Sequence, residues 1–391
     1  MNRNLWLLAL CQGLLLTNNV AFIAINGLVG LSLAPFAWMA TLPVMGYVVG
    51  GALSTPLVAR TQSRYGRRTS FQIGLAVAFA SVCAAAWAVA DKNFWLLVAA
   101  TVVAGYYSAN GQLYRFAAAE LVPVPQRERA VSLVLAGGLL GAIAGPNLAA
   151  RSRSLLDVPF AGAYVVLAGV ALLAMVLMAF VRFPPHVSAS AGASSGRPLS
   201  EIMRQPVFVV ACISAALGYG VMNLLMAATP LAMQQCGLSF DDAALVLEWH
   251  VIGMFAPGFF TGSWIKRFGA LPVMGVGVAL NLACIAIALS GVELHQFGIA
   301  LFLLGVGWNL LFTGSTTLSM AAYRPEEKDR AQAAINFCVF AVMAFTSFAS
   351  GALITTQGWT LLNWGSLVPV GLTALALVWL GSKSRPGVVR G

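Results

Sequence analysis

Long apolar runs alternate with short polar connections along the whole chain. A helix that crosses a bilayer needs about 20 predominantly apolar residues. The runs that reach this length cover residues 5–30, 36–58, 69–90, 94–122, 129–150, 159–181, 206–231, 243–265, 271–291, 297–320, 331–355 and 360–380. The pattern therefore predicts an all-α membrane protein with twelve transmembrane helices.

One connection is longer than the others. Residues 182–205 are rich in Ser, Ala, Gly and Pro, a composition typical of a flexible linker. This stretch separates the first six runs from the last six. We therefore predict an amino-terminal six-helix bundle at residues 1–181, a cytoplasmic linker at 182–205 and a carboxy-terminal six-helix bundle at 206–391.

Composition supports a lipid environment for most of the chain. Of its 391 residues, 60% are hydrophobic and 9% are charged, whereas soluble domains carry about 25% charged residues. The net charge of +10 is spread over many connections and forms no basic face of the kind that binds nucleic acid. The six cysteines lack metal-ligand spacing, so we interpret them as small apolar fillers.

The basic residues predict the orientation of the chain in the membrane, because cytoplasmic connections carry an excess of Lys and Arg. With a cytoplasmic amino terminus, 18 of the 22 Lys and Arg residues fall on the cytoplasmic side. Lys92, Arg151 and Arg153 fall outside, and Arg115 lies within a run. We therefore expect a multi-pass protein of the bacterial inner membrane with both termini in the cytoplasm.

Two basic connections, one in each predicted bundle, carry related motifs. The first reads R-T-Q-S-R-Y-G-R-R at residues 60–68, and the second reads G-S-W-I-K-R-F-G at residues 262–269. Both resemble the signature G-x-x-x-D-[RK]-x-G-[RK]-[RK] of the major facilitator superfamily. The matching positions are Arg64, Gly66, Arg67 and Arg68 in the first connection and Gly262, Arg267 and Gly269 in the second.

The resemblance implies a gating role for these connections. A glycine permits a tight turn, and arginines cap helix ends and pair with acids of the opposite half when the cytoplasmic side closes. Ala59 replaces the first glycine of the signature, and Ser63 and Lys266 replace its acid, which weakens the expected charge network. The predicted gating residues are Arg64, Gly66, Arg67, Gly262, Arg267 and Gly269. The alternative is that the basic residues only set the topology.

A second motif lies in the fifth run. Residues 141–150 read G-A-I-A-G-P-N-L-A-A, similar to the motif G-x-x-x-G-P-x-x-G-G of the family's antiporters. Small residues let helices approach closely and a proline bends a helix, so Gly145 and Pro146 are further gating candidates; ordinary helix packing is the alternative. Glu120 and Arg127 resemble the family's E-x-x-P-x-x-x-R pattern. The second half, in the stretches MAATPLAM, WHVIGMFAPGFFTG and LGVGWNLLFTG, is similar to bacterial carriers that include proposed vitamin transporters.

Polar side chains recur on one face of several runs. The resemblance implies two pseudo-symmetric bundles in which runs 1, 4, 7 and 10 line a central cavity, and the polar stripes fall on these runs. The predicted cavity residues are Gln12, Asn18, Asn19, Asn26, Tyr107, Asn110, Tyr114, Tyr219, Asn223, Trp308 and Asn309. The alternative is that their amides and hydroxyls form hydrogen bonds between helices.

Titratable residues inside the runs are few. Glu248 and His250 lie about two turns into the eighth run, where they can exchange a proton or simply reach water at the outer rim. Arg115 can hold an anionic group of a substrate or pair with Glu120. Asn336 stands where similar sequences have an aspartate. We predict Glu248, His250, Arg115 and Asn336 as the proton-coupling set.

The chain carries no metal cluster, phosphate-binding loop or paired nucleophile and base, so we expect no enzyme activity and no cofactor. Three functions remain open. The first is a monomeric secondary transporter that moves a small organic solute by alternating access, coupled to protons. The second is an uncoupled facilitator or a vitamin-type uptake carrier, for example for a riboflavin-like solute. The third, a sensor or assembly protein, is disfavoured because no long stretch outside the runs can form a soluble domain.

Overall fold

The computed structural model describes residues 3–123, 126–183, 196–324 and 327–383. Every regular element in these ranges is a helix, as the apolar runs predicted. The chain divides into two compact units. The first unit comprises Met1–Ser190 and Met233–Glu248, and the second comprises Ala191–Ala232 and Trp249–Gly391.

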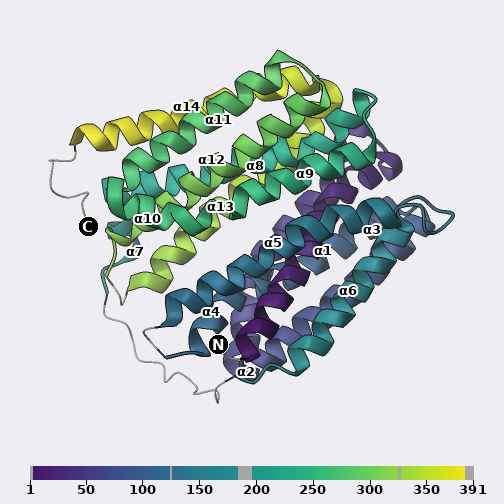
Figure 1. Ribbon diagram of the computed structural model, residues 1–391, viewed down its shortest axis with the longest axis horizontal. Helices are drawn as coiled ribbons and strands as arrows, with labels where there is room; N and C mark the ends of the chain where they lie inside the picture. The colour runs from purple at the N-terminus through teal and green to yellow at the C-terminus, as the bar shows by residue number, and fades with distance from the viewer. Residues whose placement is uncertain (1–2, 124–125, 184–195, 325–326, 384–391) are drawn as a thin grey trace. The chain divides into compact units, whose positions relative to one another are not determined.

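The first unit is built around α1, which packs against α2, α5 and α6. α1 and α5 lie side by side in both ribbon views (Figure 1). Apolar side chains fill two clusters along α1, one around Leu15 and the other around Ile25. The elements of this unit are α1 (Arg3–Leu33), a 3₁₀ turn (Ala37–Met39), α2 (Leu42–Ala90), α3 (Phe94–Gly111), α4 (Tyr114–Glu120), α5 (Arg127–Ser152) and α6 (Ala161–Ala179).

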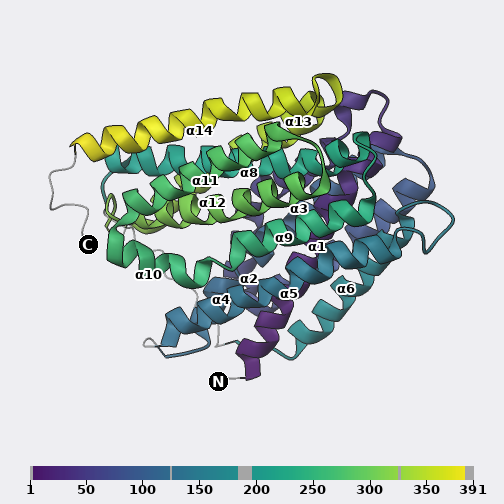
Figure 2. The ribbon, with the colours of Figure 1, turned by 45° about the horizontal axis from the view of Figure 1, so that its top comes forward.

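The second unit holds the remaining helices (Figure 2). Two of them, α8 and α9, contribute one end each to the first unit. The elements are α7 (Leu199–Met203), α8 (Pro206–Gln235), α9 (Phe240–Phe255), α10 (Gly258–Phe268), α11 (Ala270–Ser290), α12 (Leu294–Met320), α13 (Lys328–Thr356) and α14 (Gly358–Lys383).

Ten helical stretches in the described ranges are long and apolar enough to cross a membrane. One of them, Ala37–Ala90, covers the predicted run 69–90 and all but the first residue of the run 36–58. The run 94–122 is divided between α3 and α4, and the run 243–265 is divided between α9 and α10 by a short break that contains a proline. All twelve predicted runs therefore lie on helices.

Two glycines of the basic connections have unusual backbone conformations. Gly66 has φ 76° and ψ 174°, and it interrupts the helical geometry of α2. Gly269, between α10 and α11, has φ 88° and ψ 160°. Residues with a side chain adopt these angles only with strain. A similar backbone conformation therefore occurs at a glycine in each basic connection, while the gating role of these connections stays a prediction.

α2 and α3 make one of the closest backbone approaches in the first unit. A Cβ atom built on Gly105 of α3 would lie 2.2 Å from the backbone nitrogen of Gly51 and 2.4 Å from the carbonyl carbon of Gly50 on α2. Glycines at such a crossing let two helix backbones touch where any side chain would separate them.

Candidate functional site

The polar stripe of α1 is largely used to bind neighbouring helices of the first unit. Asn26 is fully buried, donates to the Phe22 carbonyl at 2.7 Å and accepts from the Tyr164 hydroxyl of α6 at 2.8 Å. Asn19 accepts a hydrogen bond from the Tyr47 hydroxyl of α2. These two predicted cavity residues therefore make the interhelical contacts that were the alternative interpretation.

Asn18 and Tyr107 are placed differently. The Asn18 amide on α1 and the Tyr107 hydroxyl on α3 are buried close to each other, and neither makes a well-formed hydrogen bond to a described residue. Burying a polar group without a partner is costly. The two groups are close enough to interact with each other, and Tyr107 belongs to the same apolar cluster as Tyr114, so their role in a cavity stays a prediction.

Two other predicted cavity residues of the first unit, Gln12 and Tyr114, are also buried. Gln12 is buried on α1. Tyr114 is fully buried in the apolar cluster around Leu15, where its ring packs edge-on against Phe71 with centroids 4.8 Å apart. Tyr114 is therefore part of the packed core.

A polar network joins Asn110 to the bend at Gly66. Asn110 donates to the Ser70 carbonyl at 2.8 Å, and its side-chain oxygen accepts from Gln62 at 3.4 Å. Gln62 also accepts from Arg67, and Arg67 forms an ion pair of 2.6 Å with Glu120 at the end of α4. This network connects a predicted cavity residue to a predicted gating residue within the first unit.

The remaining gating candidates lie outside this polar network. Arg64 and Arg267 are exposed, and each guanidinium lies over the ring of the residue that follows it, at 5.2 Å. Gly262 has open space beside it. Gly145, which precedes Pro146 in α5, packs against α1, where an added Cβ would lie 2.9 Å from the Thr17 carbonyl oxygen.

Four aromatic rings gather in the second unit; we call Tyr219, Phe255, Trp308 and Phe312 the aromatic group. Trp308 and Phe312 stack one turn apart on α12, with centroids 5.2 Å apart and planes inclined by 9°. Tyr219 of α8 meets both rings edge-on at 5.2 and 5.5 Å, and Phe255 of α9 lies 6.4 Å from Trp308. The Trp308 indole nitrogen is buried, with no hydrogen-bond acceptor among the described residues.

Sequence reasoning missed Phe255 and Phe312. The spacing of Phe312 four residues after Trp308 is a signal that could have identified it, because residues four apart share a helix face. Phe255 belongs to a different helix and gave no comparable signal.

Asn223 and Asn309 hold helices together in the second unit. Asn223 of α8 donates to Ser347 at 2.8 Å and Thr346 at 3.0 Å on α13. Asn309 of α12 accepts from the Thr261 hydroxyl of α10 at 2.7 Å and donates to a carbonyl of α9. The hydroxyl partners Ser347, Thr346 and Thr261 also lie within apolar runs. The sequence alone does not indicate which asparagine each of them contacts.

Glu248 and His250 point to different neighbours. Glu248 accepts a hydrogen bond of 2.7 Å from Asn147, the residue after Pro146 in α5. His250 is fully buried, and its Nδ1 lies 2.7 Å from the Leu301 carbonyl oxygen of α12. A carbonyl only accepts, so the proton is on Nδ1, and Nε2 has no partner among the described residues. Residues two apart on a helix do not face each other, so the structure does not bring the two groups together.

The other two predicted coupling residues belong to different units. Arg115 is half-buried on α4, with its guanidinium 4.9 Å from the Phe116 ring. Glu120 forms its ion pair with Arg67. Asn336 is exposed on α13.

Comparisons with known proteins agree with this architecture. The family model described as Major Facilitator Superfamily matches residues 5–256 and again 211–390. The chain is similar to the riboflavin transporter RfnT of Brucella anthropi, with 36% identity over 386 residues that cover 98% of this chain and 96% of that protein. It is also similar to the uncharacterised MFS-type transporter YddS of Bacillus subtilis, with 24% identity over 87% of this chain and 82% of that one.

Solved structures show the same fold. A D-xylose–proton symporter superposes with a TM-score of 0.75 at 17% identity, over 99% of each chain. A bacterial homologue of the human lysosomal transporter Spinster, in an inward-facing conformation, superposes with a TM-score of 0.75 at 13% identity over 98% of each chain.

Proposed function

Because the chain belongs to the major facilitator superfamily, whose fold has two six-helix halves, we propose that it carries riboflavin or a closely similar heteroaromatic solute across the bacterial inner membrane. It is a membrane transporter and not an enzyme. In this proposal the protein works as a monomer with both termini in the cytoplasm. It exposes the solute to each side of the membrane in turn, and protons drive the movement.

The observation that carries the proposal is the aromatic group on α8, α9 and α12. Stacked rings such as those of Trp308 and Phe312 offer faces and edges for a planar aromatic solute. The buried Trp308 N–H is a hydrogen-bond donor without an acceptor among the described residues. A flavin presents a planar fused-ring system with carbonyl oxygens at one edge, which matches this combination. The similarity to a riboflavin transporter over nearly the whole chain supports the same choice.

Uptake of riboflavin tests the substrate directly. We expect a riboflavin-requiring bacterial host to grow on low external riboflavin when it expresses this chain, and proteoliposomes to take up labelled riboflavin. An excess of an unlabelled flavin should compete, because it presents the same ring system, whereas D-xylose should not. Liposomes without protein are the control. Uptake that equals this control would reject riboflavin as the solute and leave the family assignment intact.

We propose Glu248 as the residue that couples transport to protons. Its carboxylate lies about two turns into α9, half-buried, and Asn147 donates a hydrogen bond to it. Ionisable residues inside membrane-spanning helices usually face a cavity or a partner helix and often belong to proton or ion pathways. His250 is enclosed against α12, so we assign it no role as a proton carrier.

Glu248→Gln should therefore abolish accumulation of the solute against its gradient, because the amide cannot exchange a proton. We expect gradient-driven uptake to fall about a hundredfold, the lower end of the effect of removing a positioned proton-transfer group, while exchange between labelled and unlabelled solute persists. Proteoliposomes with and without an imposed pH difference measure both quantities.

Asp241→Asn is the matched control, because Asp241 is an exposed acid on the same helix that pairs with Arg153 at 3.1 Å. It should leave the dependence on the pH difference unchanged. If wild-type uptake is the same with and without the pH difference, the chain is an uncoupled facilitator and the coupling proposal is rejected.

A further inference from the structure

We propose that Arg197 and Glu327 are positioning residues for transport: they fasten the segment Gly196–Gln205 to the end of α12 and the start of α13, so that α8, α12 and α13 move as one block. This segment leads directly into α8. The role in transport rests on the proposed function, because α8 and α12 carry three of the four residues of the aromatic group. The attachment itself does not depend on the identity of the solute.

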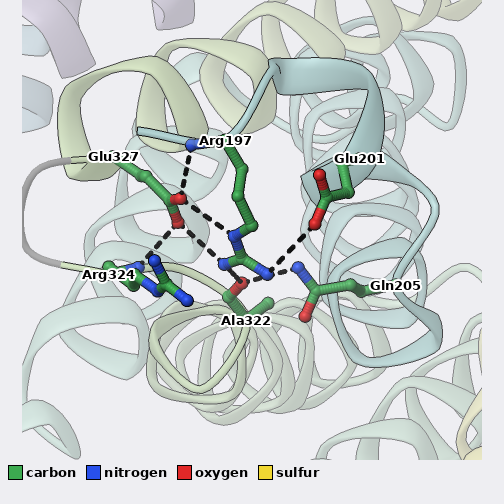
Figure 3. Close-up of polar contacts among 6 residues, drawn as sticks. All are labelled: Arg197, Glu201, Gln205, Ala322, Arg324 and Glu327. Carbon is green, nitrogen blue, oxygen red and sulfur yellow. Dashed lines mark hydrogen bonds and ion pairs between the residues drawn. The ribbon is translucent and has the colours of Figure 1, made fainter. Parts of the chain in front are cut away.

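The contact is a carboxylate surrounded by donors (Figure 3). Arg197 donates from Nε to one oxygen of Glu327 at 2.9 Å and from Nη2 to the other at 2.8 Å. The backbone N–H of Arg197 donates to the same carboxylate at 2.9 Å, and so does the backbone N–H of Arg324, at 2.9 Å. A two-pronged arginine–carboxylate contact fixes orientation as well as distance.

The Glu327 side chain is fully enclosed, whereas Arg197 retains about a quarter of its exposure, at 26%. Arg197, and to a lesser degree the Arg324 N–H, holds the pKa of the Glu327 carboxyl well below its usual range. A lowered pKa means that the contact stabilises the folded protein fully above the ordinary carboxyl value of 4.5 and that this stabilisation is lost only as the pH falls below it. The contact is therefore intact throughout the neutral range.

Two further hydrogen bonds attach the same segment to one carbonyl just after α12. Arg197 Nη2 donates to the Ala322 carbonyl at 3.1 Å, and Gln205 Nε2 donates to it at 2.8 Å. Carbonyl groups at a helix end lack partners within the helix, and the two donors satisfy this one from either end of α7. The segment thus closes the end of α12 as well as binding Glu327.

Apolar packing completes the attachment. Ile202 of α7 is fully buried in a cluster with Phe208 of α8, Ala322 after α12 and Ala331 of α13. A Cβ on Gly196 would lie 2.7 Å from Glu327 Cγ, so the chain enters the segment at a position without room for a side chain. One small cluster therefore joins all three helices at one end of the second unit.

Single and double variants of the Arg197–Glu327 pair distinguish an effect on the attachment from an effect on overall stability. Removing one partner of an enclosed ion pair leaves the other charge uncompensated, whereas replacing both partners by neutral groups is far less damaging. The double variant Arg197→Gln/Glu327→Gln should therefore fold with a melting temperature near that of the wild type and yet lack the attachment. The single variant Glu327→Gln should be less stable than either.

Hydrogen exchange on the full-length protein in nanodiscs tests the attachment without any solute. We expect backbone amides of residues 199–205 to exchange about tenfold faster or more in the double variant, because local opening no longer breaks the buried contact. Glu201→Gln is the control: it removes an exposed contact of 3.9 Å to the same arginine and should leave exchange unchanged. Unchanged exchange in the double variant would overturn the attachment.

Uptake of labelled riboflavin, expressed per folded transporter, tests the role in transport. The double variant should turn over about fivefold more slowly, with the solute concentration for half-maximal rate unchanged, because conformational steps set many turnover rates. Wild-type turnover in a double variant with fast amide exchange would overturn the positioning role. If the wild type carries no riboflavin, the proposed solute fails, whereas the exchange measurement still decides whether the segment is attached.

Discussion

Replacing Gly105 with valine is expected to prevent the first unit from folding. The added side chain would occupy the place where the backbones of α2 and α3 touch, with its Cβ 2.2 Å from the Gly51 nitrogen. Since a backbone atom cannot give way as a side-chain tip can, the two helices must separate along their crossing. We expect a cost of more than about 3 kcal/mol, the range of severe core overpacking. Size-exclusion chromatography and thermal melting of detergent-solubilised protein measure the loss.

Gly169→Val is the matched control, because Gly169 lies on α6 of the same unit and has open space around its Cβ position. Valine has the same effect on intrinsic helix propensity in both helices, so the difference between the two variants isolates the backbone contact. Equal melting temperatures for the two variants would show that α2 and α3 do not approach as closely as described.

Replacing Trp308 with alanine is expected to weaken binding of the solute about a hundredfold, because truncating a buried tryptophan at a binding site has effects of this order. Trp308→Phe should raise the apparent dissociation constant about tenfold, since it keeps a ring against Phe312 and removes one hydrogen-bond donor. Its melting temperature should change little, because the indole N–H has no acceptor among the described residues. Isothermal titration with riboflavin and thermal melting separate the two effects.

Trp359→Phe should show the opposite pattern. Trp359 is as buried as Trp308, at 7% exposure, but its N–H donates to the Ala288 carbonyl at 3.1 Å. Losing that bond should cost about 1 kcal/mol of stability and leave binding unchanged. If Trp308→Phe also lost stability and kept its affinity, the aromatic group would be part of the core and would not bind the solute.

The twelve helices could be predicted because the bilayer sets a minimum length for an apolar run, and no detail of packing is needed to count such runs. Breaks inside runs were harder to predict. The division of the run 94–122 into α3 and α4 follows from the local backbone at Gln112 and Leu113. Neither residue breaks a helix by itself, and the available signal was the Asn110-Gly111 pair at the end of α3, a dipeptide typical of turns.

The polar residues show where sequence reasoning ends. Asn26 and Asn309, predicted to line a cavity, are both buried, but a sequence pattern gives at most the face of one helix and not the helix that faces it. The partners Tyr164 and Thr261 lie 138 and 48 residues away. Glu248 and His250 were grouped because they are close in sequence, although positions two apart on a helix point in different directions.

The bend at Gly66 has a consequence for how the chain enters the membrane during synthesis. α2 reaches from Leu42 to Ala90 with no separate loop, and the bend carries four arginines between residues 60 and 68. Each arginine costs about 2.5–3.5 kcal/mol at the centre of a bilayer, so we expect this stretch to stay on the side where the ribosome delivers it. The arm that follows would then turn back at once, and we expect the translocon to release both arms together as a single helical hairpin.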